Sequence, residues 1–304
     1  MTEGLTEPQK GQLTYNSYLK VGELINLQVL QSDPPQHDEM LFIIIHQAYE
    51  LWFKQMLHEV TAMKSFLLKD DLLAVFKCCR RVIRIQDLLV KQVDILETMT
   101  PNDFNRFREL LNPASGFQSA QFRVFEFQLG LKRKSYLRYH SNDPAATKAL
   151  ETAIAEPTVY DRVLACLDRL GLDIPQEVLD RDVTTPHKES EHLAQVFGSI
   201  YRNSEAHYHV YLLLELLMDI DQKLIAWRWR HVSMVERIIG HTIGTGGSMG
   251  VDYLSSTLKK RCFPEIWSAR KYVIKDLSEK PGTMGYSGSL DSEHPQPSDP
   301  KSSP

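Results

Sequence analysis

Two histidines stand among aromatic residues at helical spacing, and each is a candidate ligand for a metal or for a planar organic molecule. His46 lies in the stretch FIIIHQAYELWF and follows Phe42 by one helical turn. His231 directly follows WRWR, near the end of a long run without glycine or proline. Noncovalent heme needs only one axial histidine, so spacing alone does not reveal such a site. The alternative is a structural histidine, which is the commoner role of a lone histidine on a helix.

Aromatic residues accompany both histidines and suit a flat aromatic cofactor. Those in helical register with them are Phe42, Phe53, Phe104, Trp227 and Trp229. Arg228 and Arg230 are candidates to meet the acidic groups of such a cofactor, because guanidinium groups pair well with carboxylates. A solvated basic face is the alternative for this pair of arginines.

Arg108 is a candidate for binding a substrate carboxylate. It follows Phe104 by four residues, so the two side chains share one face of a helix. A guanidinium beside a ring suits an amino acid or an aromatic acid, because the guanidinium pairs with the carboxylate while the ring stacks. An ion pair within the helix, with Asp103 or Glu109, is the alternative.

The glycine-rich stretch HTIGTGGSMG does not fit a nucleotide-binding loop. It lacks the Lys-Ser/Thr ending of a P-loop and the GxGxxG spacing, and it follows a helical segment where a strand is required. Two interpretations remain. The stretch is a loop between helices, or it is a mobile lid whose Thr245 hydroxyl touches a ligand.

Metal sites built from paired side chains are not indicated. A di-iron bundle needs two Glu-x-x-His pairs, and Glu189 with His192 has that spacing only within a polar connection flanked by prolines. His207 and His209 are two residues apart, so on a helix they point about 200° apart. The zinc motif HExxH and the covalent heme motif CxxCH do not occur.

The composition excludes several classes of protein. Of the 304 residues 42% are hydrophobic and 24% charged, and the net charge of −4 gives no footprint for nucleic acid or an anionic membrane. No apolar signal segment and no run long enough to span a membrane is visible. The four cysteines, which form no CxxC pair, are Cys78, Cys79, Cys166 and Cys262. We therefore expect a cytoplasmic protein with reduced thiols, no nucleic-acid partner and no membrane association.

The apolar pattern predicts helices almost throughout. Residues 37–68 and 199–239 contain neither glycine nor proline, and the second run is expected to form one long helix or two nearly collinear ones. Between 71 and 99, apolar residues recur by three and four as in a bundle seam, with Gln86 as its polar member. We expect an all-α bundle with long helices. It forms a single domain at residues 13–285, after a flexible N-terminus (1–12) and before a disordered tail (286–304).

Three long segments of the chain resemble one known family. They are HDEMLFIIIHQAYELWFKQMLHE, ILETMTPNDFNRFRELLNPASGFQSAQFR and WRWRHVSMVERIIG, the last followed shortly by GTGGSMGVDYL. Together, and in this order, they resemble the tryptophan 2,3-dioxygenases, over roughly residues 13–267. The resemblance implies an oxidoreductase with heme b in a pocket between helices, active with ferrous iron. It would open the pyrrole ring of L-tryptophan with dioxygen to give N-formylkynurenine, the first step of the kynurenine pathway of tryptophan catabolism.

The resemblance also implies roles for individual residues. His231 matches the axial ligand of the heme iron, and His46 the catalytic distal histidine that bonds the indole N–H. The remaining substrate-binding positions are Phe42 and Phe104 beside the indole, Arg108 at the carboxylate, Thr245 at the amino-acid end, Ser115 near dioxygen, and Tyr15, Tyr18 and Leu19. The last three match an N-terminal segment that completes a neighbouring subunit's site, which implies a homotetramer.

Two other hypotheses fit the composition and the helical pattern. A non-catalytic helical scaffold needs only the long helices and the seam, and it predicts a colourless protein. A nonheme metal bundle predicts bound metal without porphyrin. The visible spectrum of the protein and its content of metal and porphyrin separate these hypotheses.

Overall fold

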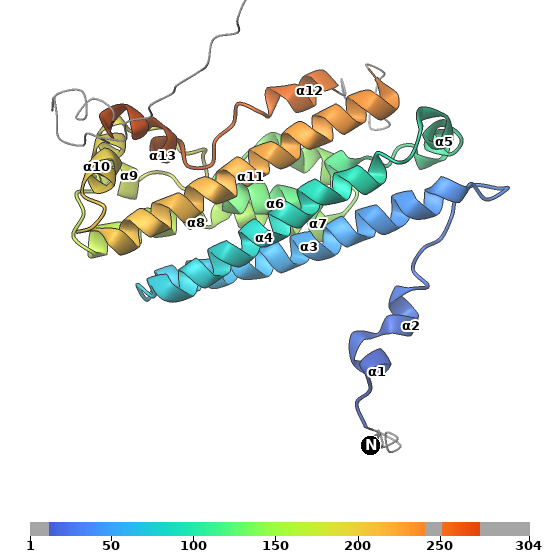
Figure 1. The fold of residues 1–304 in the computed structure, drawn as a ribbon, viewed down its shortest axis with the longest axis horizontal. Coiled ribbons are helices and arrows are strands. Elements are labelled where there is room, and N and C mark those ends of the chain that lie inside the picture. The colour runs from blue at the N-terminus through green and yellow to red at the C-terminus, as the bar shows by residue number, and fades with distance from the viewer. Residues whose placement is uncertain (1–11, 241–250, 274–304) are drawn as a thin grey trace, which may run out of the picture.

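The computed structural model describes residues 12–240 and 251–273, and these form an assembly of helices around three long ones (Figure 1). The long helices are α3 (His37–Leu67), α4 (Leu72–Leu96) and α11 (Tyr208–Ile239). The shorter ones are α1 (Tyr15–Leu19), α2 (Val21–Leu24), α5 (Pro101–Asn105), η1 (Arg108–Leu111), η2 (Gly116–Gln118), α6 (Ala120–Gln128), η3 (Lys134–His140), α7 (Pro144–Ala155), α8 (Val159–Arg169), α9 (Gln176–Leu179), α10 (Glu191–Arg202), α12 (Val251–Ser256) and α13 (Pro264–Ser268). No strand occurs among the described residues, so the all-α prediction is confirmed.

Helix α4 lies between α3 and α11 and packs along both (Figure 1). Its predicted seam is buried from Val75 to Leu96, as the spacing of three and four requires. Two buried hydrogen bonds join it to its neighbours. The Tyr49 hydroxyl of α3 donates to the carbonyl of Leu89 at 3.0 Å, and the Gln86 amide donates to the carbonyl of Ile220 in α11 at 3.1 Å.

The expectation of one long helix, or two collinear ones, over residues 199–239 is wrong. The chain forms α10, leaves helical geometry at Asn203 and resumes as α11 at Tyr208. α10 packs on α13 instead of continuing the line of α11 (Figure 1). The sequence between them, NSEAH, contains neither glycine nor proline, and Asn203 is the residue type in it that most readily leaves a helix.

The N-terminal arm, residues 13–29, extends away from the helical body (Figure 1). Many of its apolar side chains are exposed, including Tyr15 at 75% and Tyr18 at 70%. The arm meets the body where the Gln28 amide donates to Gln47 of α3 at 2.6 Å. An exposed apolar segment of this kind is characteristic of a surface that binds another protein.

A buried lysine ties together three segments that are far apart in the sequence. Lys132 is 2% exposed, and its ammonium donates to the carbonyls of Ile154 at 2.8 Å and Val183 at 2.7 Å, and also to that of Glu156. The three donors of the ammonium are thereby matched to three acceptors.

Replacing Lys132 with methionine is expected to lower the free energy of unfolding by about 3 kcal/mol, because three carbonyls lose their donor while the hydrocarbon stem is kept. Urea denaturation followed by circular dichroism measures the change. Lys148→Met is the matched control, since Lys148 is exposed on α7. A Lys132→Met protein as stable as this control would contradict the role assigned to the three bonds.

Candidate active site

A cavity of about 520 Å³ lies among α3, α5, η1, η2, α6, α11 and α12, and Leu96 of α4 also lines it. Phe42, His46, Tyr49 and Phe53, the second stripe of α3, all line it. Their spacing of four, three and four keeps them on one helix face, so a single helix supplies a continuous wall. Most of the remaining lining is apolar. The few charged and polar groups in the wall therefore interact more strongly with a bound ligand than they would in water.

His46 is open to the cavity yet deeply surrounded by protein. Its Nδ1 lies 2.7 Å from the Phe42 carbonyl oxygen, and its ring lies 4.1 Å from the Phe42 ring. Because a carbonyl only accepts, Nδ1 carries the proton and Nε2 is left as an acceptor. Burial lowers the pKa of His46, against the opposing effects of the Phe42 carbonyl and Glu50. The imidazole is therefore neutral at pH 7.

Three phenylalanine rings form a platform beside His46. The ring centroids of Phe42 and Phe104 are 5.7 Å apart, and Phe107 lies edge-on to Phe104 at 5.4 Å. Arg108, the residue after Phe107 in the sequence, also lines the cavity. Thr100 caps α5 through a reciprocal bond with Asp103, which fixes the start of the helix that carries Phe104. The predicted grouping of Phe42, His46, Phe104 and Arg108 in one place is therefore observed.

His231 lines the same cavity from α11. Its half-buried ring stacks on that of Trp227, one turn earlier, with centroids 5.2 Å apart and planes 4° apart. Burial, with the nearby His46 and Arg123, lowers the pKa of His231 to about 4. A neutral imidazole with an available lone pair is the form that binds a metal.

Two candidates in the WRWR stretch lie outside the cavity. Arg230 points to α4, where its guanidinium bonds Asp94 at 2.5 Å and Glu97 at 3.1 Å. Trp229 is 57% exposed at the surface. Arg228 and Trp227, by contrast, line the cavity. Successive helical residues are 100° apart, so only two of the four can share the face of His231.

Comparison with known proteins gives the family. A sequence model described as tryptophan 2,3-dioxygenase matches residues 1–173 and 192–273. The chain belongs to the tryptophan 2,3-dioxygenase family. The tryptophan 2,3-dioxygenase of Caulobacter vibrioides is 44% identical over 258 residues, which cover 85% of this chain and 97% of that protein. Those of Bacillus thuringiensis (42%, covering 89% and 96%) and Herpetosiphon aurantiacus (46%, covering 85% and 97%) are similarly close.

Membership in the tryptophan 2,3-dioxygenase family confirms the resemblance found in the sequence and establishes an oxidoreductase that dioxygenates tryptophan. The hypothesis of a non-catalytic scaffold is thereby wrong. The nonheme hypothesis needs three or more His, Cys, Asp or Glu side chains gathered around an ion, and the described part of the chain contains no such group. That part also has no helix both long and apolar enough to cross a bilayer.

Of the remaining predicted site residues of this dioxygenase-family chain, only Ser115 is found in the cavity wall of the described structure. Ser115 lines the cavity and caps η2 through a reciprocal bond with Gln118. Thr245 lies outside the described residues. Tyr15, Tyr18 and Leu19 belong to the exposed arm and contribute nothing to the cavity lining of their own chain.

Three further polar residues in the cavity wall were not anticipated from the sequence. Glu50 accepts from Ser119 at 2.6 Å and from Gln121 at 2.8 Å, which holds the loop carrying Ser115 against α3. Arg123 and Glu126 form an ion pair in the same wall. Their signal in the sequence is FRVFEF, two opposite charges three residues apart among phenylalanines, which predicts a buried pair.

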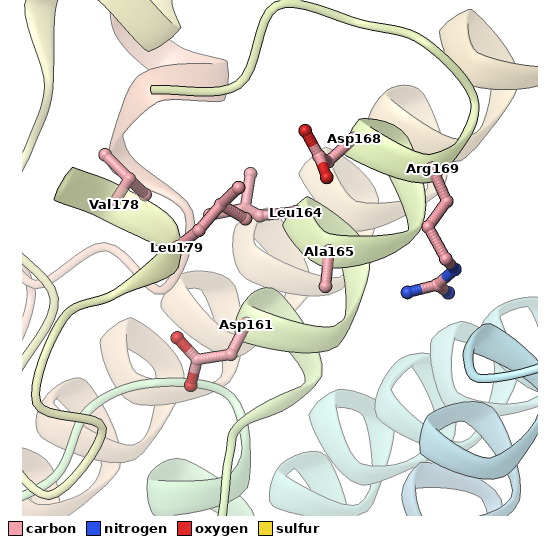
Figure 2. Close-up of a pocket in the computed structure, with 7 residues that line it drawn as sticks. All are labelled: Asp161, Leu164, Ala165, Asp168, Arg169, Val178 and Leu179. Atoms are coloured by element: carbon pink, nitrogen blue, oxygen red, sulfur yellow. The ribbon is translucent and has the colours of Figure 1, made fainter. Parts of the chain in front are cut away.

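A smaller hollow of about 220 Å³ between α8 and α9 shares no residue with the cavity (Figure 2). Two of its three charged side chains have partners elsewhere. Asp161 pairs with Arg181 at 2.6 Å, and Arg169 turns away from the hollow to Asp70, also at 2.6 Å. The hollow therefore offers little to a ligand, and the larger cavity is the candidate active site.

Proposed function

We propose that the chain dioxygenates L-tryptophan on heme b, with His231 as the axial ligand of the iron, and releases N-formylkynurenine. The observation that carries this is the presence of two histidines with lowered pKa values, His46 and His231, in the wall of one cavity but on different helices. One can then bind the iron while the other faces the substrate. Ferrous heme would supply the dioxygen chemistry when bound, and the protein supplies orientation and exclusion of water.

The cavity suits a flat, largely apolar group with acidic edges. Phe122 and Trp227, with ring centroids 4.8 Å apart, form part of its apolar wall beside His231. Arg228 brings a guanidinium to the wall one turn before His231. An imidazole, aromatic rings and guanidinium groups are the side chains that a heme with two carboxylates requires.

The substrate is proposed to lie between the phenylalanine platform and His46. Nε2 of His46 accepts the indole N–H, Phe42 and Phe104 flank the ring, and Arg108 pairs with the carboxylate. Ser115 lies near dioxygen, and the Thr245 hydroxyl bonds the amino-acid end. Phenylalanine lacks the indole N–H, so its binding would leave the buried acceptor unpaired at a cost of about 1–3 kcal/mol.

The N-terminal arm is proposed to complete the site of a neighbouring subunit in a homotetramer. Tyr15, Tyr18 and Leu19 are exposed on α1, and the arm projects from the body (Figure 1). Docking them on another copy would bury this apolar surface. The four cysteines are buried free thiols, which supports a reducing compartment such as the cytoplasm.

Anaerobic addition of L-tryptophan to the reduced full-length protein tests the proposal. The purified protein should be red with a Soret band, and tryptophan should shift that band because the substrate binds beside the iron. A colourless protein with full tryptophan turnover would refute the use of heme. A red protein whose band and thermal stability ignore tryptophan would refute the substrate site.

The pH dependence of tryptophan binding reports on His46. Because its pKa lies below the usual 6.5, the acceptor form should persist across neutral pH, and affinity should fall only as the pH drops through the lowered value. Protonation then turns Nε2 from an acceptor into a donor facing the indole N–H. Spectral titrations of the ferrous protein with tryptophan at each pH measure this. His46→Ala should remove the acid limb and His58→Gln should keep it, whereas an acid limb that survives in His46→Ala would contradict the assignment.

A further inference from the structure

Two arginines and one carboxylate lie together in the cavity wall where α6, α11 and α12 meet. Arg123 donates to Oε2 of Glu126 and Arg228 donates to Oε1, each at 2.5 Å. The exposed fractions of Arg123, Glu126 and Arg228 are 6%, 5% and 4%. Each carboxylate oxygen therefore bonds a different guanidinium, and Glu126 holds the two guanidinium groups side by side in the wall.

Both guanidinium groups are held in place by neighbours other than Glu126. That of Arg123 lies over the ring of Tyr136 at 4.4 Å and over that of Phe122 at 5.2 Å. That of Arg228 also donates to the carbonyl of Thr257 at 3.4 Å. Groups fixed in advance lose little conformational entropy when a ligand binds, so this wall is ready to bind an anion.

The electrostatic environment favours an additional negative charge. Burial would raise the pKa of Glu126, but Arg123 and Arg228 hold it below its usual value, so the carboxylate is ionised. The surroundings remain cationic even so. The pKa of Lys260 is lowered to about 8, chiefly by burial and then by Arg133, Arg228 and Arg123, against the opposing effect of Glu126. An anion entering this corner would offset the excess positive charge.

We propose that Arg123 and Arg228 together bind a carboxylate of the porphyrin and that Glu126 sets the spacing of the two guanidinium groups. The inference rests on the proposed use of heme. Arg228 precedes His231 by three residues, so both lie on one face of α11. The same helix then binds the cofactor at its centre through His231 and at its acidic edge through Arg228. The carboxylate of tryptophan is the other anion that this corner can take, and the experiment separates the two.

The test compares protoheme with its dimethyl ester, in which both carboxylates are neutral. Full-length protein freed of heme is titrated with each porphyrin, and the Soret absorbance gives the two dissociation constants. The ester is expected to bind roughly 10- to 100-fold more weakly, since charge-assisted bonds to a carboxylate are lost. No Soret band with either porphyrin would refute the heme proposal itself. Equal affinities would overturn this inference and leave the heme proposal standing.

Variants assign the effect to these arginines. In Arg228→Met and Arg123→Met the ratio of the two dissociation constants should approach one, and affinity for the ester reports whether the cavity is intact. Arg230→Met is the matched control and should keep the wild-type ratio, because Arg230 pairs with Asp94 away from the cavity. A wild-type ratio in Arg228→Met would overturn the inference. A loss of tryptophan affinity in these variants with an unchanged ratio of dissociation constants would also overturn it, because the two arginines would then bind the carboxylate of the substrate.

Discussion

Replacing His231 with alanine is expected to yield a nearly colourless protein that retains its helical content but turns over no detectable tryptophan. The loss of an axial ligand should weaken heme binding by at least roughly 100-fold, since removal of a ligand's supporting partner alone costs 10- to 100-fold. The heme content per chain, measured as the pyridine complex, gives the effect directly, and circular dichroism checks the fold.

The space left by the imidazole provides a second measurement. Because the His231 ring stacks on Trp227, free imidazole added to His231→Ala can take its place and should restore much of the Soret band. His207→Ala is the control, as His207 is exposed at the start of α11. A red His231→Ala protein without added imidazole would assign the iron to another residue.

Arg108→Ala is expected to raise the Michaelis constant for L-tryptophan roughly 100-fold while heme content stays at the wild-type level, because a bidentate, charge-assisted pair with the carboxylate is lost. Steady-state kinetics with heme-matched samples measures the change.

Tryptamine gives a control for the Arg108 prediction, because it is tryptophan without the carboxylate. Its binding should be nearly the same in wild type and Arg108→Ala. Arg106→Ala should leave both ligands unaffected, since Arg106 is exposed at the end of α5. An equal loss of affinity for tryptophan and tryptamine would indicate damage to the ring platform and not loss of a carboxylate partner.

Local periodicity predicted the parts of the site that lie on one helix. The spacing of Phe42, His46, Tyr49 and Phe53 was enough to place them on one wall, because residues separated by three or four positions lie on the same face of a helix. The spacing of Phe104 and Arg108 likewise placed the platform beside the guanidinium. That His46 and His231 share a cavity was implied only by family resemblance, since no local pattern relates residues so far apart.

The sequence did not reveal which arginine faces the cavity or how the buried charges pair. Arg228 and Arg230 differ only by their angle around α11, and the partners that select between them, Glu126 and Asp94, lie about a hundred or more residues away. Lys132 poses the same problem, because its three carbonyl partners belong to segments up to 51 residues distant. The break at Asn203 contains no glycine or proline to predict it, and α10 turns there to pack on α13.

Helix α4 contributes Leu96 to the cavity and no histidine, yet it fixes the relative positions of the two helices that carry His46 and His231. The helix that carries His46 is joined to α4 by the hydrogen bond from Tyr49 to Leu89. The helix that carries His231 is joined to it by the hydrogen bond from Gln86 to Ile220. A shift of one residue in either contact would move the histidine on that helix by about 1.5 Å along the helix axis. The distance between His46 and His231 across the cavity thus depends on two buried polar bonds to a helix that carries neither histidine.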